Sequence, residues 1–227
     1  MTTLPTHLRS PSLAKGSVTR DVRAGHQRER VLVCATEVFA KRGYQGASVD
    51  SLLAAAGVGV NNFYSLFEGK EDCFIAVLDR AERAAREAVA GAIAGSPTWE
   101  ESAYRGLAAS FGFLDDRPSE AWVLVLEAQS AGATAMARYN AILDAAVDWL
   151  RKGRESNPEA ADLPNGFEQA AVSGLAFYLQ QCLVGSIRRT PHELVSEAAI
   201  LLLEPFMGAR KLRQLERNSR LHLSTAR

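Results

Sequence analysis

Apolar positions recur along most of this chain with the spacing of one face of an α-helix. Between residues 27 and 42 they fall at Val31, Ala35, Val38 and Phe39, and the pattern stops at Gly43. This spacing predicts an amphipathic helix, and a glycine directly after it is a common helix end because glycine tolerates a positive φ. No stretch alternates apolar and polar residues as a strand would, so we expect an all-α fold. Similar spacing predicts later helices over residues 70–95, 98–113, 119–131, 134–154, 167–188 and 191–207.

Two much shorter helical stretches follow the first one. Ser48 has the side chain of an N-cap, the pattern after it reaches Ala56, and a second stretch covers residues 60–66. Gly57 and Gly59 lie between the two stretches and predict a tight turn. Short helices joined in this way are typical of a helix-turn-helix, whose second helix enters the major groove of DNA. They also occur in ordinary helical bundles, so the spacing alone leaves both interpretations open.

The second short helix has an apolar side and a polar side. Phe63 and Phe67 are expected to pack against Val38 and Phe39 of the first helix. The side chains that then face outward are Asn61, Asn62, Tyr64 and Ser65. Short hydrogen-bonding groups near the start of a recognition helix are the ones that meet base edges and phosphates.

Charge is unevenly distributed along the chain, although its 26 basic and 26 acidic residues balance. Residues 1–70 hold nine basic and five acidic residues, residues 71–207 hold eleven and twenty, and residues 208–227 hold six and one. This asymmetry suggests that only one part of the molecule meets a polyanion. Residues 1–25 lack helical periodicity and predict a flexible basic arm, which either reaches the DNA minor groove or is a disordered leader. Residues 208–227 predict a basic tail.

The composition disfavours several classes of protein. Cys34, Cys73 and Cys182 are far apart and have no CxxC spacing or neighbouring histidine, which argues against disulfides or a metal site and fits a reducing cytoplasm. The apolar runs are too short to span a bilayer and no signal peptide is visible, so we expect a cytoplasmic protein without membrane contact. No strand precedes Gly57-Val58-Gly59, as a phosphate loop would require. No Ser/His/Asp or Cys/His set can be assembled, and we therefore expect no enzyme activity, catalytic residue, cofactor or metal.

A set of motifs at fixed offsets covers residues 28–78. The motifs are Arg28-x-x-Val31-Leu32-x-x-Ala35, Phe39-Ala40-Lys41-Arg42-Gly43-Tyr44, Ala47-Ser48-Val49, Ala56-Gly57-Val58 and Phe63-Tyr64-x-x-Phe67-x-x-Lys70-Glu71. Together they resemble the DNA-binding domain of the TetR family of transcriptional regulators. The resemblance implies a helix-turn-helix DNA-binding domain in residues 26–70, followed by a helical ligand-binding and dimerisation domain in residues 71–207.

The resemblance also implies which residues meet DNA. Ser48, Tyr64 and Lys70 would contact phosphates, Val60, Asn61 and Asn62 would approach the bases, and Gly59 and Ser65 complete the expected surface. Lys70 suits this role as a point charge at the start of a helix, with a merely solvated lysine as the alternative, and Tyr64 is alternatively a core aromatic. The chain departs from the family pattern at Leu53, Gly59, Asn61, Asn62 and Leu66. These departures leave the motif intact but make the operator sequence unpredictable.

The remaining helices carry candidates for a ligand site. The candidates are Trp99, Tyr104, Phe111, Trp122, Glu127, Met136, Tyr139 and Phe177. At helical spacing most aromatic residues belong to the core, so only a minority are expected to line a pocket. Glu127 lies in a strongly apolar segment, where its carboxylate either orients a ligand or sits at a rim in a salt bridge.

The last two predicted helices, residues 167–187 and 194–206, resemble the pair that forms the family's four-helix dimer interface. Burial in the core of the monomer is an equally open interpretation. The sequence thus predicts a homodimeric, sequence-specific DNA-binding transcriptional regulator, a repressor released from its operator by a mostly apolar small molecule. The alternative is a dimeric helical small-molecule-binding protein whose helix-turn-helix no longer binds DNA.

Overall fold

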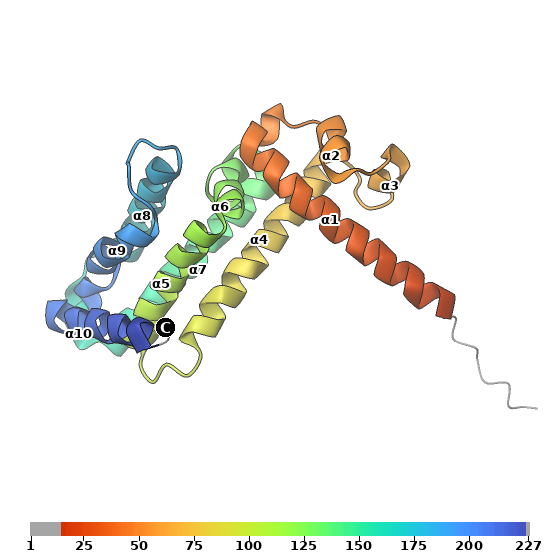
Figure 1. Cartoon of the computed structure of the whole chain (residues 1–227). Coiled ribbons are helices and arrows are strands. Elements are labelled where there is room, and N and C mark those ends of the chain that lie inside the picture. The colour runs from red at the N-terminus through yellow and green to blue at the C-terminus, as the bar shows by residue number, and fades with distance from the viewer. Residues whose placement is uncertain (1–14, 226–227) are drawn as a thin grey trace, which may run out of the picture.

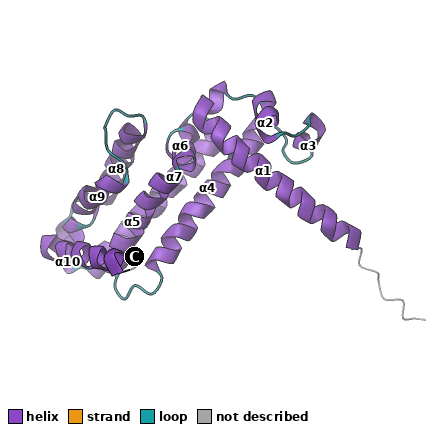
Figure 2. Cartoon of the chain, in the orientation of Figure 1, coloured by secondary structure: helices purple, strands orange, loops and turns teal. Residues whose placement is uncertain are grey.

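The computed structural model describes the backbone of residues 15–225 and the side chains of residues 25–158 and 160–218. This part of the chain folds entirely into helices and loops, which confirms the all-α prediction (Figures 1 and 2). The elements are α1 (Lys15–Gly46), α2 (Val49–Ala56), α3 (Val60–Tyr64), α4 (Lys70–Ile93), α5 (Trp99–Asp116), α6 (Pro118–Val125), η1 (Glu127–Gln129), α7 (Ala133–Ser156), η2 (Pro158–Asp162), α8 (Phe167–Leu183), η3 (His192–Leu194), α9 (Val195–Leu202) and α10 (Glu204–Thr225).

The first three helices and the start of α4 form a small domain at one end of the molecule (Figure 1). Phe39, Phe63 and Phe74 are fully buried in its core, where Phe39 and Phe74 make an edge-to-face contact with ring centroids 4.9 Å apart. Helix α2 starts as predicted, because the Ser48 hydroxyl accepts a hydrogen bond from the Ser51 backbone N–H at 3.2 Å. Buried aromatic rings thus hold the short helices that could not be stable alone.

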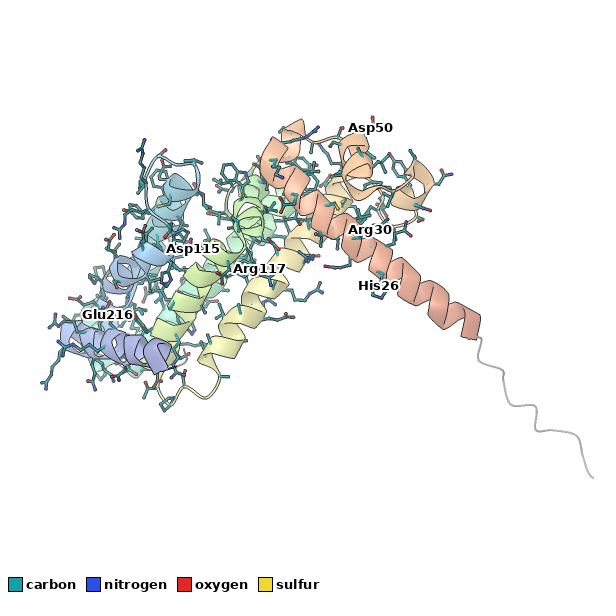
Figure 3. All side chains as sticks on the ribbon, viewed as in Figure 1. His26, Arg30, Asp50, Asp115, Arg117 and Glu216 are labelled. Atoms are coloured by element: carbon teal, nitrogen blue, oxygen red, sulfur yellow. The ribbon has the colours of Figure 1, made fainter. Side chains whose placement is uncertain are left out.

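Helix α1 is longer than the sequence pattern predicts. It begins at Lys15, so residues 15–25 of the expected flexible arm are helical, while residues 1–14 of that arm lie outside the described residues. The N-terminal part of α1 extends away from the other helices, and Figure 3 shows His26 and Arg30 along this helix. Gly43 has a φ of 71°, so the regular helix ends at the predicted glycine.

The other helices form a bundle that continues from α4. Helices α4 and α5 pack along each other, α7 lies against α8, and α9 contacts α5, α8 and α10. A second apolar core, which includes Leu150, Leu203 and Phe206, fills this end of the molecule. Thr98 caps α5, since its hydroxyl accepts a hydrogen bond from the Glu101 backbone N–H. None of the helices between residues 15 and 225 is long and apolar enough to cross a membrane.

The C-terminal region differs most from the sequence prediction. The single helix expected over residues 191–207 is divided into η3, α9 and the start of α10. Most of the expected basic tail is also helical, since α10 runs to Thr225 with a kink at Gly208, where φ is 74°. Leu212 is 2% exposed and Lys211 donates to Glu100 at 2.5 Å, so tertiary contacts hold this segment against the bundle. Residues 226–227 lie outside the described part.

Candidate DNA-binding surface and ligand cavity

Helix α3 presents the side chains expected to meet DNA. Val60 and Tyr64 are 52% and 53% exposed, and Asn61 and Asn62 are also exposed. The opposite side of the helix carries Phe63, which is fully buried. The short helix thus places its apolar ring in the core and its polar groups in solvent, and Tyr64 lies on the surface rather than in the core.

The two serines of the expected surface differ in what their hydroxyl groups can still do. The Ser48 oxygen uses a lone pair to accept from Ser51, so its hydroxyl remains a donor. Ser65 donates its hydroxyl hydrogen to the Asn62 carbonyl at 2.7 Å, which leaves it only acceptor capacity. A phosphate accepts hydrogen bonds only, so Ser48 suits a phosphate contact and Ser65 does not. Gly59, the residue before α3, is exposed and offers its backbone.

Lys70 has partners that the sequence did not predict. Its ammonium group donates to the backbone carbonyl of Tyr44 at 2.9 Å and to that of Ala47 at 3.0 Å. It also lies 4.3 Å from the centroid of the Tyr44 ring. Two of the three ammonium hydrogens are therefore used to hold the turn between α1 and α2. This corrects the sequence-based picture of a free point charge, since one hydrogen at most remains for a phosphate.

The Glu127 carboxylate was expected at a ligand or in a salt bridge, but it binds two N–H groups of the protein instead. Its Oε2 accepts from the Tyr44 backbone N–H at 2.7 Å, and its Oε1 accepts from Trp122 Nε1 at 3.0 Å. The carboxylate therefore neither lines the cavity described below nor joins a salt bridge to a basic side chain in the described residues. It connects η1 to the end of α1, across the junction between the small N-terminal domain and the bundle.

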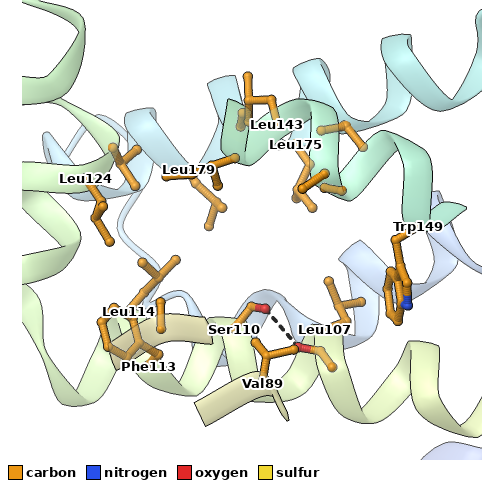
Figure 4. A pocket seen from close by; sticks show the side chains of 18 of the residues that line it. Val89, Leu107, Ser110, Phe113, Leu114, Leu124, Leu143, Trp149, Leu175 and Leu179 are labelled. Carbon is orange, nitrogen blue, oxygen red and sulfur yellow. Dashed lines mark hydrogen bonds between the residues drawn. The ribbon is translucent and has the colours of Figure 1, made fainter. Parts of the chain in front are cut away.

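The bundle contains a partly open cavity of about 520 Å³, lined by side chains of α4 to α9. Figure 4 shows its wall, which is mainly aliphatic and aromatic. The residues labelled there are Val89, Leu107, Ser110, Phe113, Leu114, Leu124, Leu143, Trp149, Leu175 and Leu179. Ser110 donates its hydroxyl to the Gly106 carbonyl at 2.8 Å, so this polar group is satisfied within its own helix. Glu82 and Arg86 are the charged lining residues, and they pair with each other on α4.

The cavity contains only part of the ligand site predicted from the sequence. Phe111 and Tyr139 line it, whereas Trp99, Tyr104, Trp122, Glu127, Met136 and Phe177 do not. Trp99 instead stacks near Trp149 and Phe206 in the second core, which reflects the general tendency of aromatic residues at helical spacing to be buried. Most of the actual lining consists of leucine, alanine and valine, which the sequence pattern could not separate from core positions.

Phe177 belongs to an apolar surface rather than to the cavity. It is 61% exposed on α8, and three other large apolar residues nearby in sequence order are exposed as well: Val184, directly after α8, at 49%, and Ile200 and Leu201, on α9, at 50% and 61%. Helices α8 and α9 contact each other, and large apolar side chains exposed on such a pair commonly mark an interaction surface. We call these four residues the α8–α9 face.

The described residues contain no group of three or more histidine, cysteine, aspartate or glutamate side chains that could hold a metal ion. Burial raises the pKa of the Cys73 thiol to about 12, with Asp72 adding to the effect, so the thiol stays protonated at neutral pH. The Cys73 thiol is thus unreactive, and the features of the described residues with the clearest geometry are the surface of α3 and the cavity.

Comparison with known proteins gives these features a context. The model of a family described as bacterial regulatory proteins, tetR family, matches residues 31–77. A search of curated proteins finds no match.

Similar solved structures include a regulator FadR from Bacillus subtilis in complex with stearoyl-CoA, with 19% identity and a TM-score of 0.62 over 77% of this chain and 97% of that one. AibR in complex with isovaleryl coenzyme A and operator DNA has 16% identity and a TM-score of 0.64 over 79% and 100%. A TetR-like regulator from Rhodococcus sp. RHA1 has 20% identity and a TM-score of 0.64 over 80% and 96%. These identities are low, so the likeness shows the shared fold.

The helix-turn-helix of this chain thus matches the model of the tetR family of bacterial regulatory proteins over residues 31–77, and the solved regulators share the fold of most of the chain.

Proposed function

We propose that this transcriptional regulator is a homodimeric repressor that binds its operator through α3 and leaves it when an acyl-CoA fills the cavity. The observation that carries the proposal is the cavity itself, because about 520 Å³ of mostly apolar space is suited to an acyl chain. The domain division follows from it: residues 26–70 would bind DNA and residues 71–207 would bind the ligand and the second subunit. A regulator acting on bacterial DNA would work in the cytoplasm.

Contact with DNA would follow from the exposure of α3. Val60, Asn61 and Asn62 would approach base edges in the major groove, and an asparagine can pair with adenine through two hydrogen bonds. Ser48 and Tyr64, which keep hydroxyl donors on the surface, would meet phosphates. Lys70 would add at most one hydrogen bond to this set, because two of its hydrogens hold the α1–α2 turn.

Recognition of the ligand would divide between the apolar wall and Arg86. Two similar structures hold acyl-CoA molecules, one with a long acyl chain and one with a short branched chain. In this chain Leu107, Leu175 and Leu179 would contact the acyl chain. The exposed guanidinium of Arg86 would leave Glu82 for the anionic part of the ligand, which its charge favours.

Dimerisation would cover the α8–α9 face. The exposed apolar side chains of Phe177, Val184, Ile200 and Leu201 lose contact with water when a second copy packs on them. A dimer also fits the task, because two recognition helices about 34 Å apart reach successive major grooves. The other interpretation, burial of these helices in the monomer core, applies to their opposite side, where Val172 and Ala199 are buried.

The proposal is tested with the wild-type protein and a cavity-filling variant. Selection from a random DNA pool should give a two-fold symmetric sequence, and adding stearoyl-CoA or isovaleryl-CoA should weaken its binding. In Leu179→Trp the larger ring should fill the cavity, so operator binding should persist while the acyl-CoA loses its effect. Coenzyme A alone is the control for the head group. Failure to select any DNA sequence would favour a small-molecule-binding protein without DNA affinity, and an acyl-CoA effect retained in Leu179→Trp would place the ligand outside the cavity.

A further inference from the structure

Both backbone polar groups of Tyr44 form hydrogen bonds with side chains of other elements. Its N–H donates to Glu127 Oε2 at 2.7 Å, and its carbonyl accepts from Lys70 Nζ at 2.9 Å. The preceding Gly43 turns the N–H out of the helix direction, since its φ is 71° and its ψ is 162°. A Cβ on Gly43 would lie 3.3 Å from Glu127 Oε2, so glycine also lets the carboxylate approach closely. The backbone at the end of α1 thus leaves room for the Glu127 carboxylate and presents an N–H group to it.

On the bundle side, Glu127 is tied to the wall of the cavity. It follows α6 after a single residue, and Leu124 and Val125 at the end of α6 line the cavity. Trp122 Nε1 donates to the second carboxylate oxygen at 3.0 Å, which fixes the orientation of the acid relative to α6. A molecule that displaces Leu124 or Val125 should therefore move Glu127 as well, because one residue separates Glu127 from Val125 and two separate it from Leu124.

On the DNA-binding side, Tyr44 lies shortly before the start of α2. Ser48 caps that helix, and Lys70 binds the carbonyls of both Tyr44 and Ala47, so residues 44–48 form a braced turn. The Gln45 amide donates to the Ser130 carbonyl at 3.1 Å, which adds a parallel link from the residues after η1. Movement of η1 is consequently passed to the N-terminus of α2 and to the helix-turn-helix that follows.

We propose that Glu127 is a positioning residue that couples the wall of the cavity at α6 to the orientation of α2 and α3. The mechanical coupling stands on the contacts above, and only its control by a ligand rests on the proposed function. Hydrogen bonds that a carboxylate accepts from N–H groups are short and directional, so the link transmits displacement better than apolar packing does. Glu127 acts through Tyr44 and touches neither DNA nor the contents of the cavity.

A second polar bridge crosses the same junction and is the natural competitor. Arg80 of α4 donates to Glu29 of α1 at 2.6 Å and to Glu120 of α6 at 3.3 Å. Glu29 is exposed, and both contacts join long side chains, whereas Glu127 binds the backbone of the turn directly. Glu120 lies one helical turn before Leu124 on α6, so this bridge reaches the cavity wall only through two long side chains. The Arg80 bridge therefore holds the domains together but is less directly connected to the cavity wall.

The coupling is tested by a double-mutant cycle that requires neither ligand nor DNA. Backbone hydrogen exchange over residues 44–52 is measured by mass spectrometry in the full-length protein, in Leu124→Ala, in Glu127→Gln and in the double variant. Glutamine is neutral and has a single acceptor oxygen, so the bond from the Tyr44 amide is lost when the NH₂ group faces Tyr44 and is weakened by the loss of negative charge when the oxygen does. We expect Glu127→Gln to speed exchange of the Tyr44 amide about tenfold or more, as loss of a hydrogen bond to a charged acceptor implies.

Leu124→Ala should then change the hydrogen-exchange rates of residues 44–52 when Glu127 is present. The same substitution should change these rates much less in the Glu127→Gln background. The control is Glu100→Gln, which removes a comparable contact to Lys211 elsewhere in the bundle and should leave the effect of Leu124→Ala intact. An effect of Leu124→Ala that is equal in both backgrounds would overturn the coupling, as would a Tyr44 amide that exchanges equally slowly with and without Glu127.

A separate experiment measures whether a ligand controls operator binding through Glu127. The operator dissociation constant is measured with and without saturating stearoyl-CoA, and repeated with isovaleryl-CoA, in wild type, Glu127→Gln and Trp122→Phe. A typical allosteric factor is about 5–150-fold, and in Glu127→Gln it should fall close to one while the affinity of the acyl-CoA for the free protein stays the same. Lack of acyl-CoA binding to wild type would count against the proposed function alone, because the exchange experiment still decides on Glu127. Binding with an unchanged factor in Glu127→Gln would refute the role of Glu127.

Discussion

Replacement of Lys70 by methionine separates a structural role from a DNA-contacting role for this residue. Methionine keeps an unbranched side chain of similar length, so the packing of the stem is largely preserved while the ammonium group is removed. The carbonyls of Tyr44 and Ala47 then lose the donor that lies 2.9 and 3.0 Å away. The Tyr44 ring also loses a cation 4.3 Å from its centroid.

The expected loss of stability is large for a single residue. A hydrogen bond to a charged group contributes about 1.5–3 kcal/mol, and a partly exposed site such as this one falls at the lower end because water can replace the donor. The cation–π contact adds about 0.5–1 kcal/mol. We therefore expect Lys70→Met to lower the free energy of unfolding by about 2–4 kcal/mol, against a typical total of about 5–15 kcal/mol.

The assay is urea unfolding of the DNA-free protein, together with the salt dependence of operator binding. Lys41→Met is the matched control, since Lys41 lies on α1 with its side chain 75% exposed and pairs only loosely with Glu37 at 3.6 Å. It should change stability by less than about 0.5 kcal/mol. A lysine that mainly contacts a phosphate would instead leave the unfolding free energy unchanged and reduce the slope of log K against log salt by about one. That pair of results for Lys70→Met would refute the structural reading of Lys70.

Three further predictions concern specificity, assembly and pH. Asn61→Ala or Asn62→Ala should relax base preference at one symmetric pair of operator positions, at a cost of about 1–3 kcal/mol; selection of the wild-type consensus by both variants would make these residues mere helix surface. Phe177→Glu should place a charge on the α8–α9 face and shift sedimentation from dimer to monomer, whereas an unchanged dimer would put the interface elsewhere. The Arg154 guanidinium, which donates to Glu168 at 2.8 Å, lowers the pKa of the Glu168 carboxyl below its ordinary 4.5. The pair should therefore stabilise the fold above that pH and lose its contribution as the pH falls through the lowered pKa. In Glu168→Gln the free energy of unfolding, measured with urea, should fall less as the pH is lowered through this range. An unchanged pH dependence would disprove the assignment.

The helix boundaries show where a local pattern is sufficient. Ser48 and Gly57 were predicted as the ends of the first short helix, and the structure has the expected cap at each. Caps are decided by a few neighbouring residues, because the side chain or the positive φ acts within one turn of backbone. The segments at residues 15–25 and 208–225 were predicted less well. Both segments lack a strong apolar face, and the α5 residues that hold the C-terminal segment are distant from it in sequence.

The candidate sites show the opposite situation. The exposed side of α3 follows from the burial of Phe63, so the outward asparagines could be read from spacing. The cavity could not be located, because a leucine that lines a cavity and a leucine that fills a core have the same pattern. Phe177 was likewise misplaced, since a helical wheel gives the direction of a side chain but not what lies in that direction.

The sequence by itself determined the all-α fold and the helix-turn-helix with its resemblance to the tetR-family DNA-binding domain, because helix periodicity, caps and the fixed offsets of one motif are properties of short segments. Tertiary structure alone decided the roles of Lys70 and Glu127. Both were charged residues whose sequence context suggested an external partner, and both bind the backbone around Tyr44 instead. Lys70 follows Tyr44 at a separation of 26 residues and Glu127 at a separation of 83. A hydrogen bond requires approach to within about 3 Å, and at such separations only the packing of the whole chain brings the two groups together.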